Sequence, residues 1–391
     1  MEKRPSRLRS FAANLGLLLA GTILALGVLE VALRIHNPFY SRIKGNRLVL
    51  TANTQVRVTN IVAPGLDREV TVTRNALGFR GPNPPADLDQ RLTLIAIGGS
   101  TTESRLLAED STWVARLGRL LEPSFHGAWI NNAGIAGHTT YGHLVMLEDY
   151  VAKLRPKVVL FLVGINDVGK AGMNDFDAGN VRGGIRFGSL RDFLKSATAY
   201  SEVATLAAMV YRSMLAHQLG LRHEVLELKK LRIQRTTPEE ERALVTRFAA
   251  PLQLGAFAER LQQLIRAARA GGAEPVFMTE PALPGVGVDD VTGLDLATLP
   301  ANQFGNGRML WDLLEAYNDV TRRVCREQGV KVIDVAQEMR KSSRYFFDLV
   351  HFNNRGADEF ARLTYRSLCP WLASRYPGLV TGECADVGER P

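Results

Sequence analysis

The chain has 391 residues, which is enough for one large domain or two ordinary ones. Hydrophobic residues make up 46% and charged residues 23%, values that exclude an intrinsically disordered chain. The formal net charge is +8, but the basic residues form no single cluster with interleaved aromatic residues. This pattern argues against a nucleic-acid partner and is compatible with a nearby anionic membrane surface.

The N-terminus combines a basic segment with a long apolar one. Residues 1–10 hold four basic side chains, and Phe11–Leu29 then gives 19 mostly apolar residues. About 20 such residues cross the hydrocarbon core of a bilayer. We expect a transmembrane signal anchor over residues 11–33, with Glu30 and Arg34 at its outer end. Two alternatives are a cleaved signal peptide, which favours a shorter apolar core, and a buried core helix, which seldom lies at a basic terminus.

The basic residues also predict orientation. Positive charge before a span keeps that side in the cytoplasm. We therefore expect residues 1–10 to be cytoplasmic. The protein is then a single-pass protein of the cell (inner) membrane, with its catalytic domain in the periplasm or outside the cell. Protein partners remain unknown from the sequence.

Three cysteines, Cys325, Cys369 and Cys384, are too few and too scattered for a disulfide framework or a zinc site. We expect three unpaired thiols, with a Cys369–Cys384 bond as the alternative outside the cytosol. The sequence has no Walker loop and no G-x-G-x-x-G motif. We therefore expect no metal and no cofactor.

Residues 34–90 have no long helical pattern and are interpreted as a juxtamembrane extension that packs on the main domain. Arg47–Thr59 and Glu69–Thr73 alternate as short strands do, and residues 75–82 are rich in turn formers. After Leu92 the pattern changes to alternating strands and helices. The predicted strands are Leu92–Ile97, Ala128–Ala133, Lys157–Val163, Pro275–Thr279 and Val330–Val335. The predicted helices are Trp113–Leu121, Tyr141–Leu154, Ala256–Ala270, Met309–Gln328 and Arg355–Leu368.

This alternation predicts an α/β fold, with a mostly parallel sheet between two layers of helices. The catalytic domain is expected over residues 91–375, followed by a tail at 376–391. An insertion at about 171–251 interrupts the rhythm with helices Ser189–Leu219 and Arg222–Ile233. It is either a solvated helical excursion or a lid over the site. Asn353 or Asn354 could cap the last helix.

Four short motifs end strands or lie in loops that would reach one edge of the sheet. They are Gly98–Thr102, Asn132–Gly137, Gly164–Asp167 and Asp348–His351. Open α/β sheets bind their ligands at the carboxyl ends of the strands. Each motif is weak alone, but together they predict a site.

The residue types fit acyl-transfer chemistry. The hydroxyl of Ser100 needs a base, which His351 can supply, and Asp348 can fix the tautomer of that imidazole. Oxyanion donors would be the backbone N–H groups of Ser100 and Gly137 and the side-chain amide of Asn166. Each residue also has an ordinary interpretation, as a helix cap, a turn residue or a surface histidine. Their joint occurrence favours the catalytic one.

These motifs resemble those of the SGNH hydrolases, also called GDSL esterases and lipases, over roughly Leu92–Leu368. GGSTT replaces the usual GDS around Ser100, while Gly137, Asn166 and the Asp348–His351 pair match the three later blocks. The resemblance implies a flavodoxin-like three-layer α/β/α sandwich and serine ester chemistry. The GFRGP stretch and the N-terminal anchor resemble those of membrane-anchored bacterial members.

The resemblance implies ester chemistry and leaves the substrate open. We expect a small-molecule or glycan ester, first an O-acetyl or other O-acyl group on a glycan and second a lipid ester. The alternatives are an O-acyltransferase that uses the same serine, and a catalytically silent binding or assembly subunit. His126, His138 and His143 are interpreted as loop and helix-surface residues, with His138 close enough to Gly137 to touch substrate.

Overall fold

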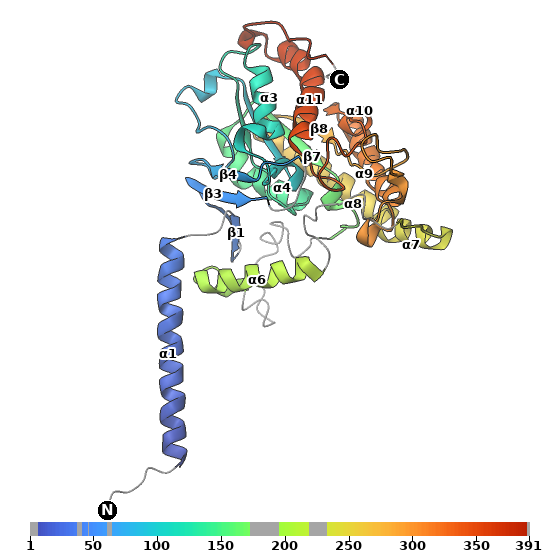
Figure 1. Ribbon diagram of the computed structural model, residues 1–391. Coiled ribbons are helices and arrows are strands. Elements are labelled where there is room, and N and C mark those ends of the chain that lie inside the picture. The colour runs from blue at the N-terminus through green and yellow to red at the C-terminus, as the bar shows by residue number, and fades with distance from the viewer. Residues whose placement is uncertain are drawn as a thin grey trace, which may run out of the picture.

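The structure is a computed structural model that describes residues 7–36, 41–45, 47–60, 65–172, 195–218 and 233–388. Its first helix, α1 (Arg7–Ile35), projects as an isolated rod from an α/β body (Figure 1). Within it, Phe11–Ile35 is long and apolar enough to cross a membrane, with a mean hydropathy of 2.2 and no part of the window buried. This agrees with the single apolar segment expected at the N-terminus.

The bounds of the remaining elements are as follows. The strands are β1 (Ser41–Lys44), β2 (Arg47–Leu50), β3 (Thr54–Thr59), β4 (Glu69–Arg74), β5 (Thr93–Gly98), β6 (Trp129–Asn132), β7 (Val158–Val163), β8 (Glu274–Thr279) and β9 (Lys331–Ile333). The helices are α2 (Ser100–Glu103), α3 (Trp113–Leu121), α4 (Thr140–Met146), α6 (Glu202–Gln218), α7 (Pro238–Phe248), α8 (Pro251–Ala270), α9 (Gly307–Glu327), α10 (Val335–Glu338) and α11 (Asn354–Arg375).

The central sheet has five strands in the order β6-β5-β7-β8-β9, and every neighbouring pair is parallel. Counted along the chain this is the order 2-1-3-4-5 of flavodoxin-like folds. The predicted α/β fold with a parallel sheet is therefore confirmed. The order reverses between β5 and β7, so the loops that follow these two strands diverge and leave a crevice at the carboxyl edge.

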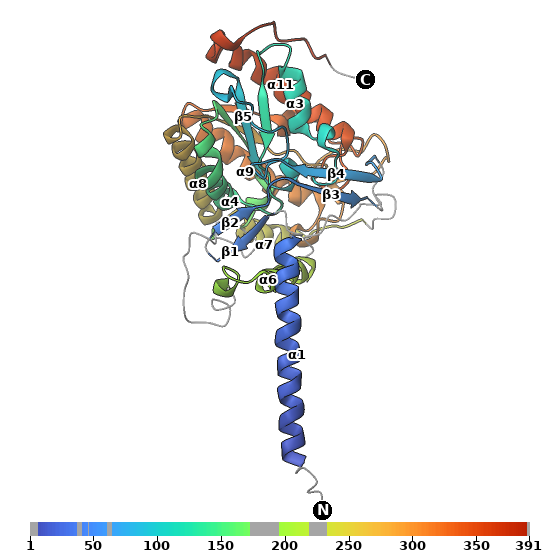
Figure 2. The ribbon, with the colours of Figure 1, turned by 90° about the vertical axis from the view of Figure 1, so that its left-hand side faces the viewer.

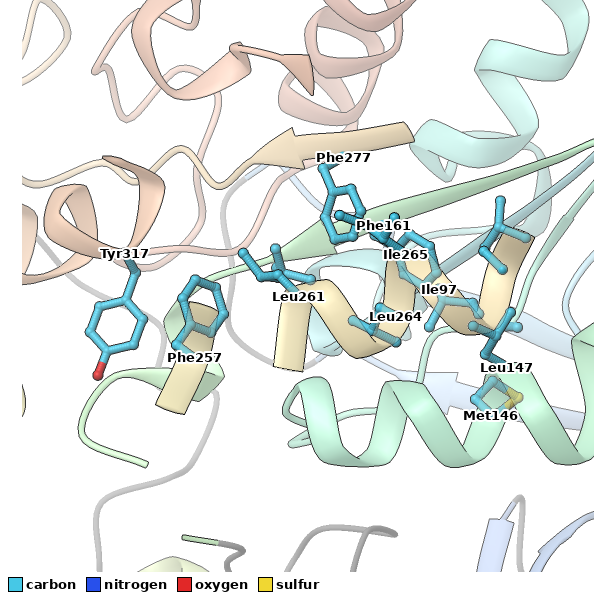
Figure 3. Close-up of a cluster of buried hydrophobic side chains, with 14 of the residues drawn as sticks. Ile97, Met146, Leu147, Phe161, Phe257, Leu261, Leu264, Ile265, Phe277 and Tyr317 are labelled. Atoms are coloured by element: carbon cyan, nitrogen blue, oxygen red, sulfur yellow. The ribbon is translucent and has the colours of Figure 1, made fainter. Parts of the chain in front are cut away.

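Helices cover both faces of the sheet (Figures 1 and 2). Alternating side chains of β5 point to opposite sides, so Leu94 and Ala96 pack with α3 and α11, whereas Ile95 and Ile97 pack with α4, α8 and α9. Both strand faces are buried, which explains the continuous apolar run. Figure 3 shows the second cluster, in which the rings of Phe161 and Phe277 stack at 4.8 Å.

The juxtamembrane extension packs on this body. Strands β3 and β4 form an antiparallel hairpin, and β1 pairs with β2. Arg80, in the GFRGP stretch, is only 1% exposed, and its guanidinium donates to the carbonyl oxygens of Glu103, Ser104 and Leu107 at 2.7, 2.8 and 3.0 Å. The extension therefore holds the segment that follows α2.

The expectation of three unpaired thiols is wrong, because Cys369 of α11 and Cys384 of the tail form a disulfide. The tail returns over the body, where Thr381 N–H donates to Ser124 O at 3.0 Å. That return brings Cys384 to α11. Cys325 is a free, buried thiol.

Only part of the insertion can be compared with the structure. Its described residues contain α6 and α7 and no strand. The predicted helix Arg222–Ile233 falls, except for its last residue, outside the described residues. At the last helix, Asn353 is the N-cap, since its side chain accepts from Gly356 N–H.

Candidate active site

The crevice between β5 and β7 collects the residues that the motifs predicted. Strand β5 ends at Gly98, and Ser100 is the first residue of α2. Strand β7 ends at Val163 and leads into a short 3-10 turn that carries Asn166. The loop before α11 places His351 over the same edge, within hydrogen-bond distance of Ser100.

Ser100, His351 and Asp348 form one hydrogen-bonded chain. His351 Nε2 lies 2.7 Å from Ser100 Oγ, and His351 Nδ1 lies 2.7 Å from Asp348 Oδ2. The other carboxylate oxygen of Asp348 accepts from the backbone N–H groups of Val350 and His351, at 2.9 and 2.7 Å. Asp348 is thus both a turn residue and the partner of the imidazole, and the turn fixes the carboxylate against the ring.

The surroundings of His351 favour its charged form. Burial alone would lower the pKa of His351, but the charge and hydrogen bond of Asp348, together with Glu280, raise it above its ordinary value. Burial would likewise raise the pKa of Asp348, yet the interaction with His351 and the two backbone N–H groups lower it. Asp348 is therefore ionised and stabilises an imidazolium, which is what a base that takes the proton of Ser100 becomes.

Asn166 lies next to Gly99, the residue before the serine, and its amide bonds the residue that follows Gly137. The side-chain Nδ2 of Asn166 donates to His138 O at 3.0 Å, which uses one of its two amide hydrogens. A Cβ on Gly99 would lie 2.2 Å from this same nitrogen, so any larger residue next to Ser100 would displace the Asn166 amide. Gly137 has φ +75° in the turn closed by His138 N–H and Ile135 O, a conformation that glycine adopts without strain.

A buried ion pair supports the turn that carries Asn166. Asp167 accepts from the backbone N–H and hydroxyl of Thr140 at 3.1 and 2.6 Å, and Arg260 of α8 lies 3.2 Å from the same carboxylate. The turn after β7 is thereby joined to the start of α4. This arrangement fixes the position of the Asn166 amide.

Sequence reasoning missed Glu280, which follows β8 and is 2% exposed. Its carboxylate accepts from the hydroxyl of Thr101 at 2.7 Å and from the N–H of Ile165 at 3.0 Å. Glu280 thus joins the loop of the nucleophile to the loop of Asn166. Burial raises the pKa of Glu280. The hydrogen bonds from Thr101 and Ile165 and the charge of His351 lower it by a smaller amount, so the net shift is upward. A single glutamate after a strand carries no motif that would have revealed it.

His138 lies in a loop as expected, but it is only 4% exposed. The interpretation of His143 as a helix-surface residue is wrong, because it lies in α4 and is 2% exposed. Burial lowers the pKa of His138 to about 4 and that of His143 to about 3, so both are neutral at pH 7. His126 is exposed, as expected.

A small hollow with a volume of about 20 Å³ opens beside Ser100. It is lined by Ser100, Thr101, Glu103, Ser104, Arg105, Leu106, Leu107, Phe347, His351 and Phe352. The ring of Phe347 stacks on the imidazole of His351, with ring centroids 5.6 Å apart. Among the described residues, no group of three or more His, Cys, Asp or Glu side chains is placed to hold a metal ion.

Comparison with known families agrees with this geometry. The model of the GDSL-like lipase/acylhydrolase family matches residues 96–358, which include Ser100, Asn166 and His351. The chain belongs to this family. It is accordingly a serine hydrolase that acts on ester bonds, with the SGNH fold. None of the curated proteins matches the chain in sequence.

Several solved structures resemble this one. An α/β hydrolase, LAE5, from the metagenome of Lake Arreo in Spain has 17% identity and a TM-score of 0.38, over 71% of this chain and 94% of its own. The acetyl xylan esterase AlAXEase has 14% identity and a TM-score of 0.39, over 70% of this chain and 98% of its own. A catalytic mutant of Axe2, an acetylxylan esterase from Geobacillus stearothermophilus, has 15% sequence identity and a TM-score of 0.39. The match covers 70% of this chain and 93% of the Axe2 chain. These values carry no information about the substrate of this chain.

Proposed function

We propose that this SGNH hydrolase is a membrane-anchored serine esterase whose catalytic triad is Ser100, His351 and Asp348. The observation that carries the proposal is the unbroken hydrogen-bonded chain from Ser100 Oγ through the imidazole to the Asp348 carboxylate. A serine hydroxyl is a weak nucleophile without such a base. An intact chain of this kind argues against a silent scaffold.

Each group has one role in the reaction. His351 Nε2 takes the proton of Ser100 Oγ as that oxygen attacks the ester carbonyl carbon. The tetrahedral oxyanion is then bound by the N–H groups of Ser100 and Gly137 and the free amide hydrogen of Asn166. The imidazolium gives its proton to the leaving alcohol oxygen, which leaves an acyl-serine. His351 then takes a proton from a water molecule, whose oxygen attacks the acyl carbon. As the acyl–oxygen bond breaks, the imidazolium returns that proton to Ser100 Oγ, and the carboxylic acid leaves.

The hollow supports a short acyl group. Its volume is only about 20 Å³, and charged and hydroxyl side chains share its lining with leucine and phenylalanine. A long acyl chain would need an extended apolar channel, which this hollow does not provide. The preferred substrate is therefore an O-acetyl or other short O-acyl ester on a glycan, ahead of a lipid ester.

Two observations support placing the domain outside the cytoplasm. The apolar helix follows a basic segment, which keeps residues 1–10 inside. The Cys369–Cys384 disulfide joins the catalytic domain to the tail, and disulfides persist in oxidising compartments such as the periplasm. A reporter fused after Arg34 should then be active outside the cytoplasm, and a reporter active only inside would contradict the orientation.

The full chain in detergent micelles tests the reaction and the acyl length together. We expect it to cleave acetyl esters faster than octanoyl or palmitoyl esters of the same alcohol, and to release acetate from an O-acetylated glycan. The Ser100→Ala variant is the matched control and should release none. Faster cleavage of the long esters would favour the lipid substrate. Transfer of acetate to an added sugar in place of water would favour the acyltransferase.

A further inference from the structure

Helix α6 begins beside the end of α1 that is nearest the body. The carboxylate of Glu30, directly after the apolar run of α1, accepts from Ser201 Oγ at 2.9 Å and from the N–H groups of Glu202 and Val203 at 3.0 Å each. Arg34 also donates to Tyr200 O at 2.9 Å. Figure 1 shows α6 beginning beside this end of α1 and running away from it, below the body. Residues about 170 positions apart thus fix α6 to the anchor.

A second set of contacts holds α6 against the juxtamembrane extension. Lys44 Nζ lies 2.6 Å from Glu202, and Gly45 N–H donates to Thr198 Oγ1 at 2.9 Å. Glu202 and Thr205, one turn apart, are buried. Met209 lies on the same side of the helix and is partly buried, so this side of α6 combines polar and apolar residues.

The opposite face of α6 is apolar and exposed. Val203, Ala207, Val210 and Met214 follow one another at the spacing of a single helix face, and Tyr211 lies beside them. Val210, Tyr211 and Met214 are 45%, 65% and 63% exposed. We call these five residues the outer face of α6. A helix of a soluble domain turns its apolar side inward, so an apolar face that stays exposed is typical of a surface that contacts something else.

The position of α6 along α1 identifies the medium that this face meets. The 19 residues Phe11–Leu29 extend over about 28 Å as a helix, which matches the hydrocarbon thickness of a bilayer. Glu30, and with it the first turn of α6, then lies at the boundary between hydrocarbon and headgroups. Amphipathic helices lie at this depth with their apolar face toward the acyl chains, and tyrosines are enriched there.

We propose that the outer face of α6 lies on the lipid surface of the membrane that α1 crosses. The inference rests on the proposed membrane anchoring and adds a second membrane contact to it. With α1 perpendicular to the bilayer and α6 along its surface, the body is held at a fixed height and orientation. The contacts of Glu30, Lys44 and Gly45 transmit that orientation to the extension.

The test uses the full chain in vesicles of phosphatidylcholine and phosphatidylglycerol. The Met214→Cys variant carries an environment-sensitive fluorophore on the new cysteine. Labelling is selective, because the native Cys325 is buried and the other two cysteines form a disulfide. His126→Cys is the matched control, because His126 is exposed and its N–H bonds Leu379 in the C-terminal segment, which lies opposite α1 (Figure 1). We expect nitroxide lipids labelled near the headgroup to quench the fluorophore at position 214 but not at position 126.

Three other outcomes would overturn the proposal, and they differ. If aqueous iodide quenches position 214 as well as position 126, the outer face stands in water. If neither quencher reaches position 214 and chemical cross-linking gives dimers, a second copy covers it. If the chain does not float with the vesicles, the anchor itself fails. Ester hydrolysis by the same preparation is measured separately, so loss of the membrane contact is not confused with loss of the catalytic proposal.

Discussion

The carboxylate of Glu280 receives the hydroxyl hydrogen of Thr101, the residue directly after the serine, at an oxygen–oxygen distance of 2.7 Å. Its second oxygen receives the N–H of Ile165, directly before Asn166, at 3.0 Å. One buried side chain thus sets the distance between the nucleophile and a predicted oxyanion donor. Its charge also raises the pKa of His351.

Replacing Glu280 with glutamine should change both stability and pH dependence. The amide has one acceptor where the carboxylate had two, so one buried donor loses its partner, at about 1–3 kcal/mol of unfolding free energy. Loss of the negative charge should lower the pKa of His351. In a plot of kcat/KM against pH, the decrease on the acid side (the acid limb) should then move to lower pH. The control is Glu274→Gln at the other end of β8, which should leave the limb in place. An unmoved limb in Glu280→Gln would show that Glu280 is a structural residue only.

The acid limb itself should report the raised pKa of His351. The imidazole must be neutral to accept the proton of Ser100, so kcat/KM should fall as pH decreases through a pKa above the ordinary histidine value. In Asp348→Asn the charge that raises this pKa is gone. The limb should then move to lower pH, while kcat falls by roughly 10,000-fold because the tautomer is no longer fixed. A limb that stays in place in this variant would assign the titration to another group.

Asn166→Ala distinguishes an oxyanion donor from a structural amide. Loss of a donor that acts mainly in the transition state should lower kcat by roughly 100- to 1,000-fold and change KM little. Asn306, the N-cap of α9, is the matched control. Asn306→Ala should cost about 1 kcal/mol of stability and keep kcat. If Asn166→Ala instead lowers the melting temperature and keeps kcat, Asn166 does not bind the oxyanion.

The Cys369–Cys384 disulfide closes a short loop, with the two residues 15 positions apart. A loop of this length stabilises the folded chain by about 3 kcal/mol in the chain-entropy treatment. Cys384→Ser should therefore lower the midpoint of denaturant unfolding, and dithiothreitol should do the same to the wild type. Three free thiols in unreduced, exported protein, with no effect of dithiothreitol, would contradict the disulfide and the placement it supports.

Patterns local in sequence predicted the fold and the main residues of the site. The apolar runs of β5 and β7 end in Gly98–Thr102 and Gly164–Asp167, so the positions of Ser100 and Asn166 followed from strand ends, whereas Asp348 and His351 were found from their spacing in a loop. Glu280 could not be predicted, because its partners Thr101 and Ile165 lie 179 and 115 residues away.

Other features depend on tertiary packing in the same way. His138 and His143 occur in a segment of mixed polarity, and only the packing of the loop before α4 and of α4 itself buries them. The disulfide needed the return of the tail across Ser124. The contact of Glu30 with the start of α6 joins segments that share no sequence pattern.

The most direct test of the catalytic proposal is labelling of the full chain with a fluorophosphonate, with the modified residue located by mass spectrometry. Because His351 activates Ser100, we predict one adduct, on Ser100, that is absent in Ser100→Ala and His351→Ala and forms more slowly in Asn166→Ala. Absence of labelling in folded wild-type protein, or an adduct on a different serine, would contradict the assignment of Ser100 as the nucleophile.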